Sequence, residues 1–195
     1  MTKREEIILS TLNLASKYGL KSLSMSQIAE SVGIKKPSLY NHFNSKEELI
    51  KEMYEYIRNQ SKQDIPNVSI EDILKKSTYD ILFNSVMNYK KMIMNEEMFK
   101  FYSVIYSERA TNNEASQIVV EETNKMINAT KALFALLKEN NKLVIDDIEM
   151  ASISFSMTIH SLIDYEIDLK KSNQNYDENN ISKYIKWFSS QYSKE

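Results

Sequence analysis

Apolar positions recur every three or four residues along most of the chain, and this spacing predicts helices. No stretch alternates polar and apolar residues for long enough to indicate a sheet, and only two prolines occur. The first helix is predicted from about Thr2 to Gly19, with an inner face of Ile8, Leu12 and Ala15. An all-α protein with short polar loops is therefore expected.

Two short helices joined by a tight turn are predicted between Ser24 and Lys46. The first carries an apolar stripe made by Met25, Ile28, Ala29 and Val32, and the second carries Leu39 and Phe43. Gly33 lies between the stripes, where a turn needs a residue that tolerates positive φ. Ser24 followed by Gln27 fits a capping box at the first helix start. The small side chain of Ala29 would let the two helices cross closely.

The start of the second helix is unusual. Pro37 suits a first helical turn, because its missing N–H group costs nothing there, and it places Lys36 at the predicted cap. Lysine is a poor cap, so the first N–H groups would lack a side-chain acceptor beside the positive charges of Lys35 and Lys36. A phosphate could occupy this position, and water could occupy it equally well.

The exposed side of the same helix is polar. Short or planar groups that can reach phosphates or base edges in a major groove follow one another, namely Ser38, Tyr40, Asn41 and His42. The alternative is that these groups only solvate a surface helix. The neighbouring helix and turn favour the DNA-binding interpretation.

Residues 4–50 resemble the DNA-binding domain of the tetracycline-repressor-like (TetR) family of transcriptional regulators, notably in IAESVGIKKPSLYNHFNSKEEL. The resemblance covers about a quarter of the chain and implies that the second helix of the pair reads DNA. It assigns base contacts to Lys36, Pro37, Ser38 and Asn41, and phosphate contacts to Ser24, Lys35, Tyr40, His42 and Lys46. Many members of the family have threonine where Ser24 stands and glycine where Pro37 stands.

The domain organisation follows from the breaks between helices. A helix-turn-helix DNA-binding domain is expected over residues 1–46, a connecting helix and linker over 47–66, and a helical effector-binding and dimerisation domain over 67–195. Pro66 marks the last boundary. Beyond it, five helices bring the total to about nine, and they are predicted at residues 70–91, 95–109, 113–140, 147–170 and 178–193.

Charge and composition reduce the number of function classes that fit the chain. The net charge is −2, but residues 1–63 hold ten basic and seven acidic side chains. The N-terminal part is therefore positively charged, and the rest of the chain is acidic. The absence of cysteine excludes disulfides and thiolate metal sites, and no cofactor is expected. No apolar run approaches the roughly 20 residues that cross a bilayer, and the first residues lack a signal peptide. A cytoplasmic protein without a membrane partner is expected.

A homodimer is predicted from the last two helices. The first of them is apolar on two sides and needs two partners, and the second has apolar residues at helical spacing. A four-helix bundle with a second chain would satisfy both, as the resemblance also implies, through Ile153, Met157, Ile163, Ile181, Tyr184, Ile185 and Phe188. The alternative is a single larger core.

A small-molecule effector is predicted from aromatic and methionine side chains in the second domain. Methionine is flexible and polarizable, so such residues can line a pocket for a largely apolar ligand, and the candidates are Tyr79, Phe83, Met87, Met98, Phe101, Tyr102, Ile105, Met126, Phe155 and His160. The alternative is that they are core. TetR-like regulators usually hold an effector cavity in this domain. Ligand binding would then move the sixth predicted helix against the fourth and release operator DNA.

Two other functions compete with a ligand-released repressor. An enzyme is disfavoured, because the chain has two histidines and no cysteine. His160 and Ser161 could belong to a triad, but adjacent residues of one helix point about 100° apart. The second rival is a helix-turn-helix protein that binds DNA architecturally or under control of a protein partner, without a small-molecule effector.

Overall fold

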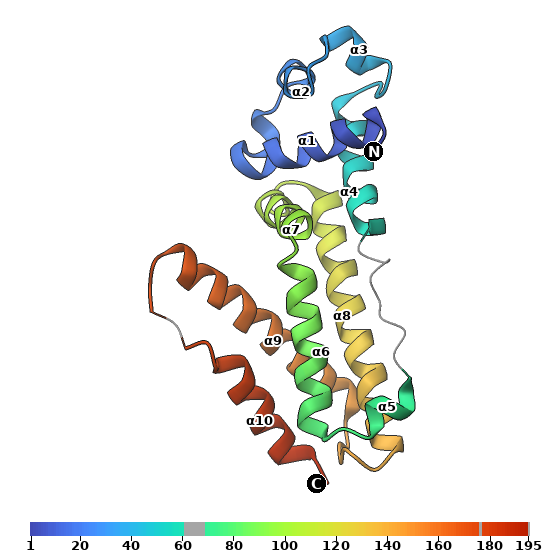
Figure 1. Cartoon of the computed structure of the whole chain (residues 1–195), viewed down its shortest axis with the longest axis vertical. Helices are drawn as coiled ribbons and strands as arrows, with labels where there is room; N and C mark the ends of the chain where they lie inside the picture. Colours follow the sequence, from blue (N-terminus) through green and yellow to red (C-terminus); the bar gives the residue numbers. More distant parts are fainter. Residues whose placement is uncertain (61–68, 176, 195) are drawn as a thin grey trace. The chain divides into compact units, whose positions relative to one another are not determined.

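The computed structural model describes residues 1–60, 69–175 and 177–194, and within these ranges the regular elements are helical (Figure 1). The first part of the chain forms α1 (Lys3–Tyr18), the short 3-10 helix η1 (Leu20–Ser22), α2 (Met25–Ser31), α3 (Lys36–Tyr40) and α4 (Lys46–Gln60). The rest forms α5 (Ile70–Leu74), α6 (Thr78–Ile93), α7 (Glu96–Glu108), α8 (Asn113–Glu139), α9 (Ile148–Lys171) and α10 (Asn180–Tyr192). The prediction of an all-α fold is confirmed.

The helix predicted over residues 70–91 is two helices, α5 and α6. The chain breaks because Ser77 starts a new helix: its hydroxyl accepts the backbone N–H of Asp80 at 3.1 Å and donates to the Asp80 carboxylate at 2.6 Å. The described residues therefore form ten α-helices where about nine are predicted. The Ser-x-x-Asp spacing at residues 77–80 was the sequence signal for this boundary.

The first of two compact units comprises the described residues within Met1–Pro66 and Met92–Val119. Here α1 packs against α2, α4 and α7, and α4 also packs against α7. The core includes Leu12 and Ile28 from the first two helices, Leu49 and Met53 from α4, and Phe101 from α7. Thus α7 belongs to the same packed unit as the N-terminal helices. The domain boundaries expected at residues 46 and 66 stay a prediction.

The second unit comprises the described residues within Asn67–Lys91 and Val120–Glu195. Its core contains aromatic rings from three helices: Phe134 of α8 lies 5.4 Å from Phe155 of α9 and 5.3 Å from Phe188 of α10, centroid to centroid. Helices α9 and α10 pack alongside each other (Figure 1). Among the helices of the described residues, none has the length and apolar character needed to cross a membrane.

Candidate nucleic-acid interface

The helix-turn-helix pair has a capping box at the start of α2 and a tight turn at its end. At the start of α2, the Ser24 hydroxyl accepts the Gln27 N–H at 3.3 Å, and the Gln27 side chain accepts the Ser24 N–H at 2.8 Å. This confirms the predicted capping box. At the end of α2, Gly33 has φ of 68°, and the next N–H, from Ile34, bonds back to the Ala29 carbonyl at 3.0 Å. Gly33 thus turns the chain as predicted.

The α3 helix presents almost all of its side chains to solvent. Lys35 is its N-cap, so the prediction that Lys36 occupies the cap is wrong by one residue, and Pro37 follows in the first turn. As predicted, no side chain caps the first N–H groups. Leu39 is the one buried residue of this helix, which packs against α2, and its side chain belongs to the core of the unit. The remaining side chains are therefore available to another molecule.

The exposed surface of α3 is basic and polar. The predicted contact residues Lys35, Lys36, Pro37, Ser38, Tyr40 and Asn41 are all exposed, and His42 just beyond the helix is half-buried. The Lys36 ammonium lies 6.0 Å from the centroid of the Tyr40 ring. No acidic residue occurs between Glu30 and Glu47 in the sequence. An incoming polyanion would meet two exposed lysines, Lys35 and Lys36, and no carboxylate along α3 and its cap.

Two of the predicted phosphate contacts are already engaged within the protein. The Lys46 ammonium donates to the Leu20 carbonyl at 2.8 Å and to the Leu23 carbonyl at 2.5 Å, which caps the C-terminal end of η1. The Ser24 hydroxyl donates to the Gln27 side chain at 2.8 Å. Beside Lys46, a bond from the Glu47 backbone N–H and one from the Ser45 hydroxyl hold the pKa of the Glu47 carboxyl below its ordinary value.

Arg4, which no sequence motif indicated as a functional residue, joins three parts of this unit. Its Nε atom donates to Glu52 Oε2 at 2.9 Å, and its two terminal nitrogens donate to Glu52 Oε1 and to the His42 carbonyl. Its guanidinium carbon lies 4.3 Å from the centroid of the Phe43 ring. Arg4 and Glu52 lie 48 positions apart in the sequence, so no local pattern indicates the pair.

The predicted dimer residues differ in exposure. Within one chain, the side chains of Ile163, Ile181, Ile185 and Phe188 are buried, with at most 4% of their surface exposed. Ile153 and Tyr184 are half-buried, and Met157 is 42% exposed. Large exposed side chains that sequence analysis did not select lie on the same two helices: Met150 and Tyr165 on α9, and Trp187 on α10. With Met157, they offer more surface than the four buried residues.

The predicted pocket residues fall into the two units. Met98, Phe101, Tyr102 and Ile105 of α7 belong to, or pack against, the core that contains the DNA-binding helices. In the second unit, Tyr79 stacks on Phe83 at 5.7 Å, Phe155 packs among aromatic rings, and Met87 and Met126 are half-buried. The His160 Nδ1 atom lies 3.0 Å from the hydroxyl of Tyr89.

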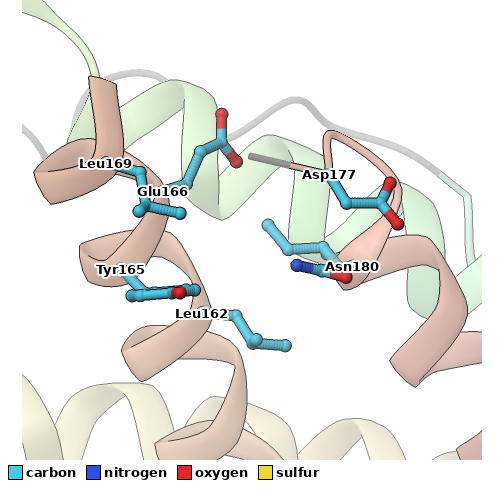
Figure 2. Close-up of a pocket in the computed structure, with 7 residues that line it drawn as sticks. Leu162, Tyr165, Glu166, Leu169, Asp177 and Asn180 are labelled. Carbon is cyan, nitrogen blue, oxygen red and sulfur yellow. The ribbon is translucent and has the colours of Figure 1, made fainter. Parts of the chain in front are cut away.

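A small surface pocket lies between the C-terminal half of α9 and the start of α10 (Figure 2). Figure 2 shows Tyr165, Leu162 and Leu169 of α9 on one side and Asn180 on the other. The Glu166 carboxylate pairs with Lys90 at 2.6 Å, and the Asp177 carboxylate pairs with Lys183. The pocket contains none of the ten residues predicted to line an effector site.

An N-terminal helix-turn-helix with an exposed basic second helix, followed by an all-helical body, defines the class of helix-turn-helix regulatory proteins. Residues 7–53 match the family model of bacterial regulatory proteins, tetR family. The chain therefore carries the N-terminal domain of the TetR family, as the sequence predicted.

Relatives and solved structures agree with this assignment. The chain is 34% identical over 95 residues to the biofilm operon icaADBC HTH-type negative transcriptional regulator IcaR of Staphylococcus aureus; the match covers 46% of this chain and 50% of IcaR. It thus spans about half the length of this curated relative. Its fold is similar to that of a TetR-family transcriptional regulator from Mesorhizobium loti, with a TM-score of 0.72, 19% identity and coverage of 99% and 100% of the two chains. The flavonoid-responsive regulator FrrA has a TM-score of 0.68 and 18% identity, with 98% of each chain covered.

Proposed function

We propose that this protein is a sequence-specific DNA-binding repressor of transcription that acts as a homodimer. The observation that carries the proposal is the exposed surface of α3, where Lys35 and Lys36 accompany polar side chains and no carboxylate lies nearby in the sequence. Such a surface attracts the phosphates of DNA, and Asn41 can form two hydrogen bonds with an adenine edge in a major groove. The name of IcaR, a negative regulator, supports repression over activation.

Dimerisation through α9 and α10 gives the proposed repressor two DNA-binding domains. One α3 helix contacts only a few base pairs, whereas a two-fold dimer reads two half-sites and multiplies specificity. The exposed apolar residues of α9, Met150, Met157 and Tyr165, are separated by seven and eight positions and so share one face of the helix. Trp187 adds an exposed ring on α10. These side chains are the proposed centre of the interface.

We further propose that a small, largely apolar ligand bound in the C-terminal part releases the protein from DNA. FrrA, which shares the fold, is named as flavonoid-responsive. The contact between α7 and α4 supports a route to the DNA-binding helices: the ring centroids of Tyr54 on α4 and Phe101 on α7 lie 6.0 Å apart. A ligand that favoured another position of α7 would therefore act on α4 and change the separation of the two α3 helices.

Control by a protein partner is the second candidate. The packing of Phe155 against Phe134 and Phe188 favours it, because this predicted pocket residue belongs to the buried aromatic core of the second unit. A screen of flavonoids and other planar apolar compounds separates the two candidates. A ligand that raises the melting temperature and weakens DNA binding supports the effector proposal. A ligand that binds and leaves DNA affinity unchanged refutes release.

The DNA-binding proposal is tested by selection from a random-sequence duplex library, followed by anisotropy titrations of the recovered duplex and a shuffled duplex at several salt concentrations. Lys35→Gln should weaken binding to both duplexes and reduce the salt slope by about 0.9, since one phosphate contact is lost. Asn41→Ala should weaken binding to the recovered duplex by about 1–3 kcal/mol and leave binding to the shuffled duplex nearly unchanged. Lys35 is a cleaner probe than Lys46, whose loss also removes two bonds to η1.

Lys100→Gln is the matched control, because Lys100 forms a surface pair with Glu96 on α7, outside the helix-turn-helix. It should bind both duplexes like the wild type. The proposed function is wrong if the wild type recovers no preferred sequence. The division of roles is wrong if Lys35→Gln and Asn41→Ala affect both duplexes equally.

A further inference from the structure

The α3 helix is too short to fix its own position. It has five residues, and isolated helices shorter than about 12 residues are marginal in water. Leu39 is its one buried side chain, so packing alone holds it at a single point. The orientation of α3 must therefore be set by the segments that precede and follow it.

The preceding segment is held by the backbone of the turn at Gly33, described above. The segment after α3 is held by side chains from other helices. Arg4 of α1 donates to the His42 carbonyl and lies over the Phe43 ring, with 4.3 Å between its guanidinium carbon and the ring centroid. Glu48 of α4 accepts the N–H of Asn44 at 2.7 Å. Three consecutive residues are thus fastened from α1 and α4.

Arg4 is itself held in one orientation. Glu52 accepts two hydrogen bonds from it, one from Nε at 2.9 Å and one from a terminal nitrogen, and Glu48 Oε1 lies 3.8 Å from the same terminal nitrogen. Such a two-pronged pair fixes a planar group better than a single contact does. A lysine at this position would keep the charge but could not bond Glu52 at two points, bond His42 and cover Phe43 together.

We propose that Arg4 is a positioning residue for DNA recognition, which with Glu52 sets the orientation of α3 without touching DNA. The inference rests on the proposed function. The carboxylates of Glu48 and Glu52 offset the charge of Arg4, so it is not one of the phosphate contacts. Removing it should let α3 tilt, and base contacts depend on that orientation more steeply than contacts between flexible lysines and phosphates do.

The test compares Arg4→Lys and Glu52→Gln with the wild type on two probes: the duplex that the wild type recovers from a random library, and a shuffled duplex. Both variants should bind the recovered duplex about tenfold more weakly or worse, and the shuffled duplex within about twofold of the wild type. The salt slope should not change, because no phosphate contact is lost. The double variant should bind the recovered duplex only slightly less tightly than the weaker-binding single variant, since the two substitutions remove the same restraint.

Arg109→Lys is the matched control. Arg109 lies 4.9 Å from the centroid of the Tyr106 ring, in the same unit but outside the helix-turn-helix, so this exchange breaks a similar contact. It should keep the ratio of the two affinities. All binding is measured well below the melting temperature of each variant, with the folded state verified by circular dichroism.

Three results would overturn the inference. A salt slope that falls by about 0.9 in Arg4→Lys would make Arg4 a phosphate contact. An unchanged affinity ratio in both variants, with only a lower melting temperature, would make the contact purely structural. A wild type that selects no sequence would refute the proposed function together with this inference, whereas the first two results leave the proposed function intact.

Discussion

Tyr54→Phe should stabilise the protein, although it deletes a polar group from a packed helix interface. The Tyr54 side chain is 1% exposed, and its hydroxyl has no hydrogen-bond partner among the described residues. Burial, together with the negative charges of Glu108 and Glu114, raises the pKa of the Tyr54 phenol above its ordinary value of 10.0, so it stays neutral. The phenol therefore lacks both a partner and contact with bulk water.

The expected size of the effect follows from the missing bond. A buried hydroxyl without a partner costs about 1–3 kcal/mol relative to its hydrated state, and phenylalanine keeps the ring contact with Phe101. Some packing is lost with the oxygen atom, so we expect a net gain of about 1 kcal/mol. For a chain of this size, that gain raises the melting temperature by about 2–4 °C.

Tyr184→Phe is the matched control with the opposite sign. The pKa of the Tyr184 phenol is also raised by burial, but its hydroxyl has a hydrogen bond with Thr158. Losing that bond should cost about 1 kcal/mol. Urea unfolding is followed by circular dichroism and by the fluorescence of Trp187, the one tryptophan of the chain, whose ring lies 5.8 Å from that of Tyr184.

A decrease of about 1 kcal/mol or more in the free energy of unfolding of Tyr54→Phe, as breaking a satisfied hydrogen bond would cause, would refute the expected stabilisation. The Tyr54 hydroxyl would then have a partner in solution, and the carboxylates of Glu108 and Glu114 would be the first candidates. Equal shifts in the Tyr54 and Tyr184 variants would show that the substitution acts through the lost oxygen volume and not through hydrogen bonding.

Two other predictions concern the second unit. Burial alone would raise the pKa of the Glu166 carboxyl, but hydrogen bonds from Lys170 and Lys90 outweigh burial, so the pKa is lowered. The stability that a carboxylate with a lowered pKa contributes is lost when the carboxylate is protonated. Glu166→Gln should therefore destabilise the protein most at neutral pH and progressively less as pH falls below about 4.5. Urea titrations from pH 3 to 7 measure the difference in the free energy of unfolding between the variant and the wild type, and a difference that does not change with pH would contradict the prediction. Trp187→Glu, and separately Met157→Glu, should convert a dimer to monomers in sedimentation experiments, whereas Tyr18→Glu, at a residue 66% exposed on α1, should not. A dimer that persists in both α9–α10 variants would move the interface elsewhere.

Local signals explain what could be predicted from the sequence. Capping boxes and glycines act within a few residues, so the start of α1 at Thr2, the start of α2 at Ser24 and the turn at Gly33 could be located directly. The break before α6 carried a similar signal in Ser77 and Asp80. Among the candidate DNA contacts, the exposure of Ser38, Tyr40 and Asn41 also followed from helical spacing, whereas His42 is half-buried.

The interactions that could not be predicted join residues far apart in the sequence. Lys46 looks like a phosphate ligand in isolation, and only the folded chain places its ammonium between the carbonyls of Leu20 and Leu23. Phe101 looks like a pocket residue, but it packs beneath Tyr54 of α4. In the same way, an apolar stripe does not show whether its residues meet their own chain, as Ile185 does, or a second copy.

The single buried side chain of α3 has a consequence for the evolution of such proteins. Because Leu39 is the one side chain of this helix that is buried in the core, its outward positions can mutate with little cost in folding free energy. Duplicated copies of the gene could therefore drift to new target sequences one substitution at a time, without passing through unfolded intermediates. Residues such as Leu39 and Gly33, by contrast, should remain fixed while recognition diverges.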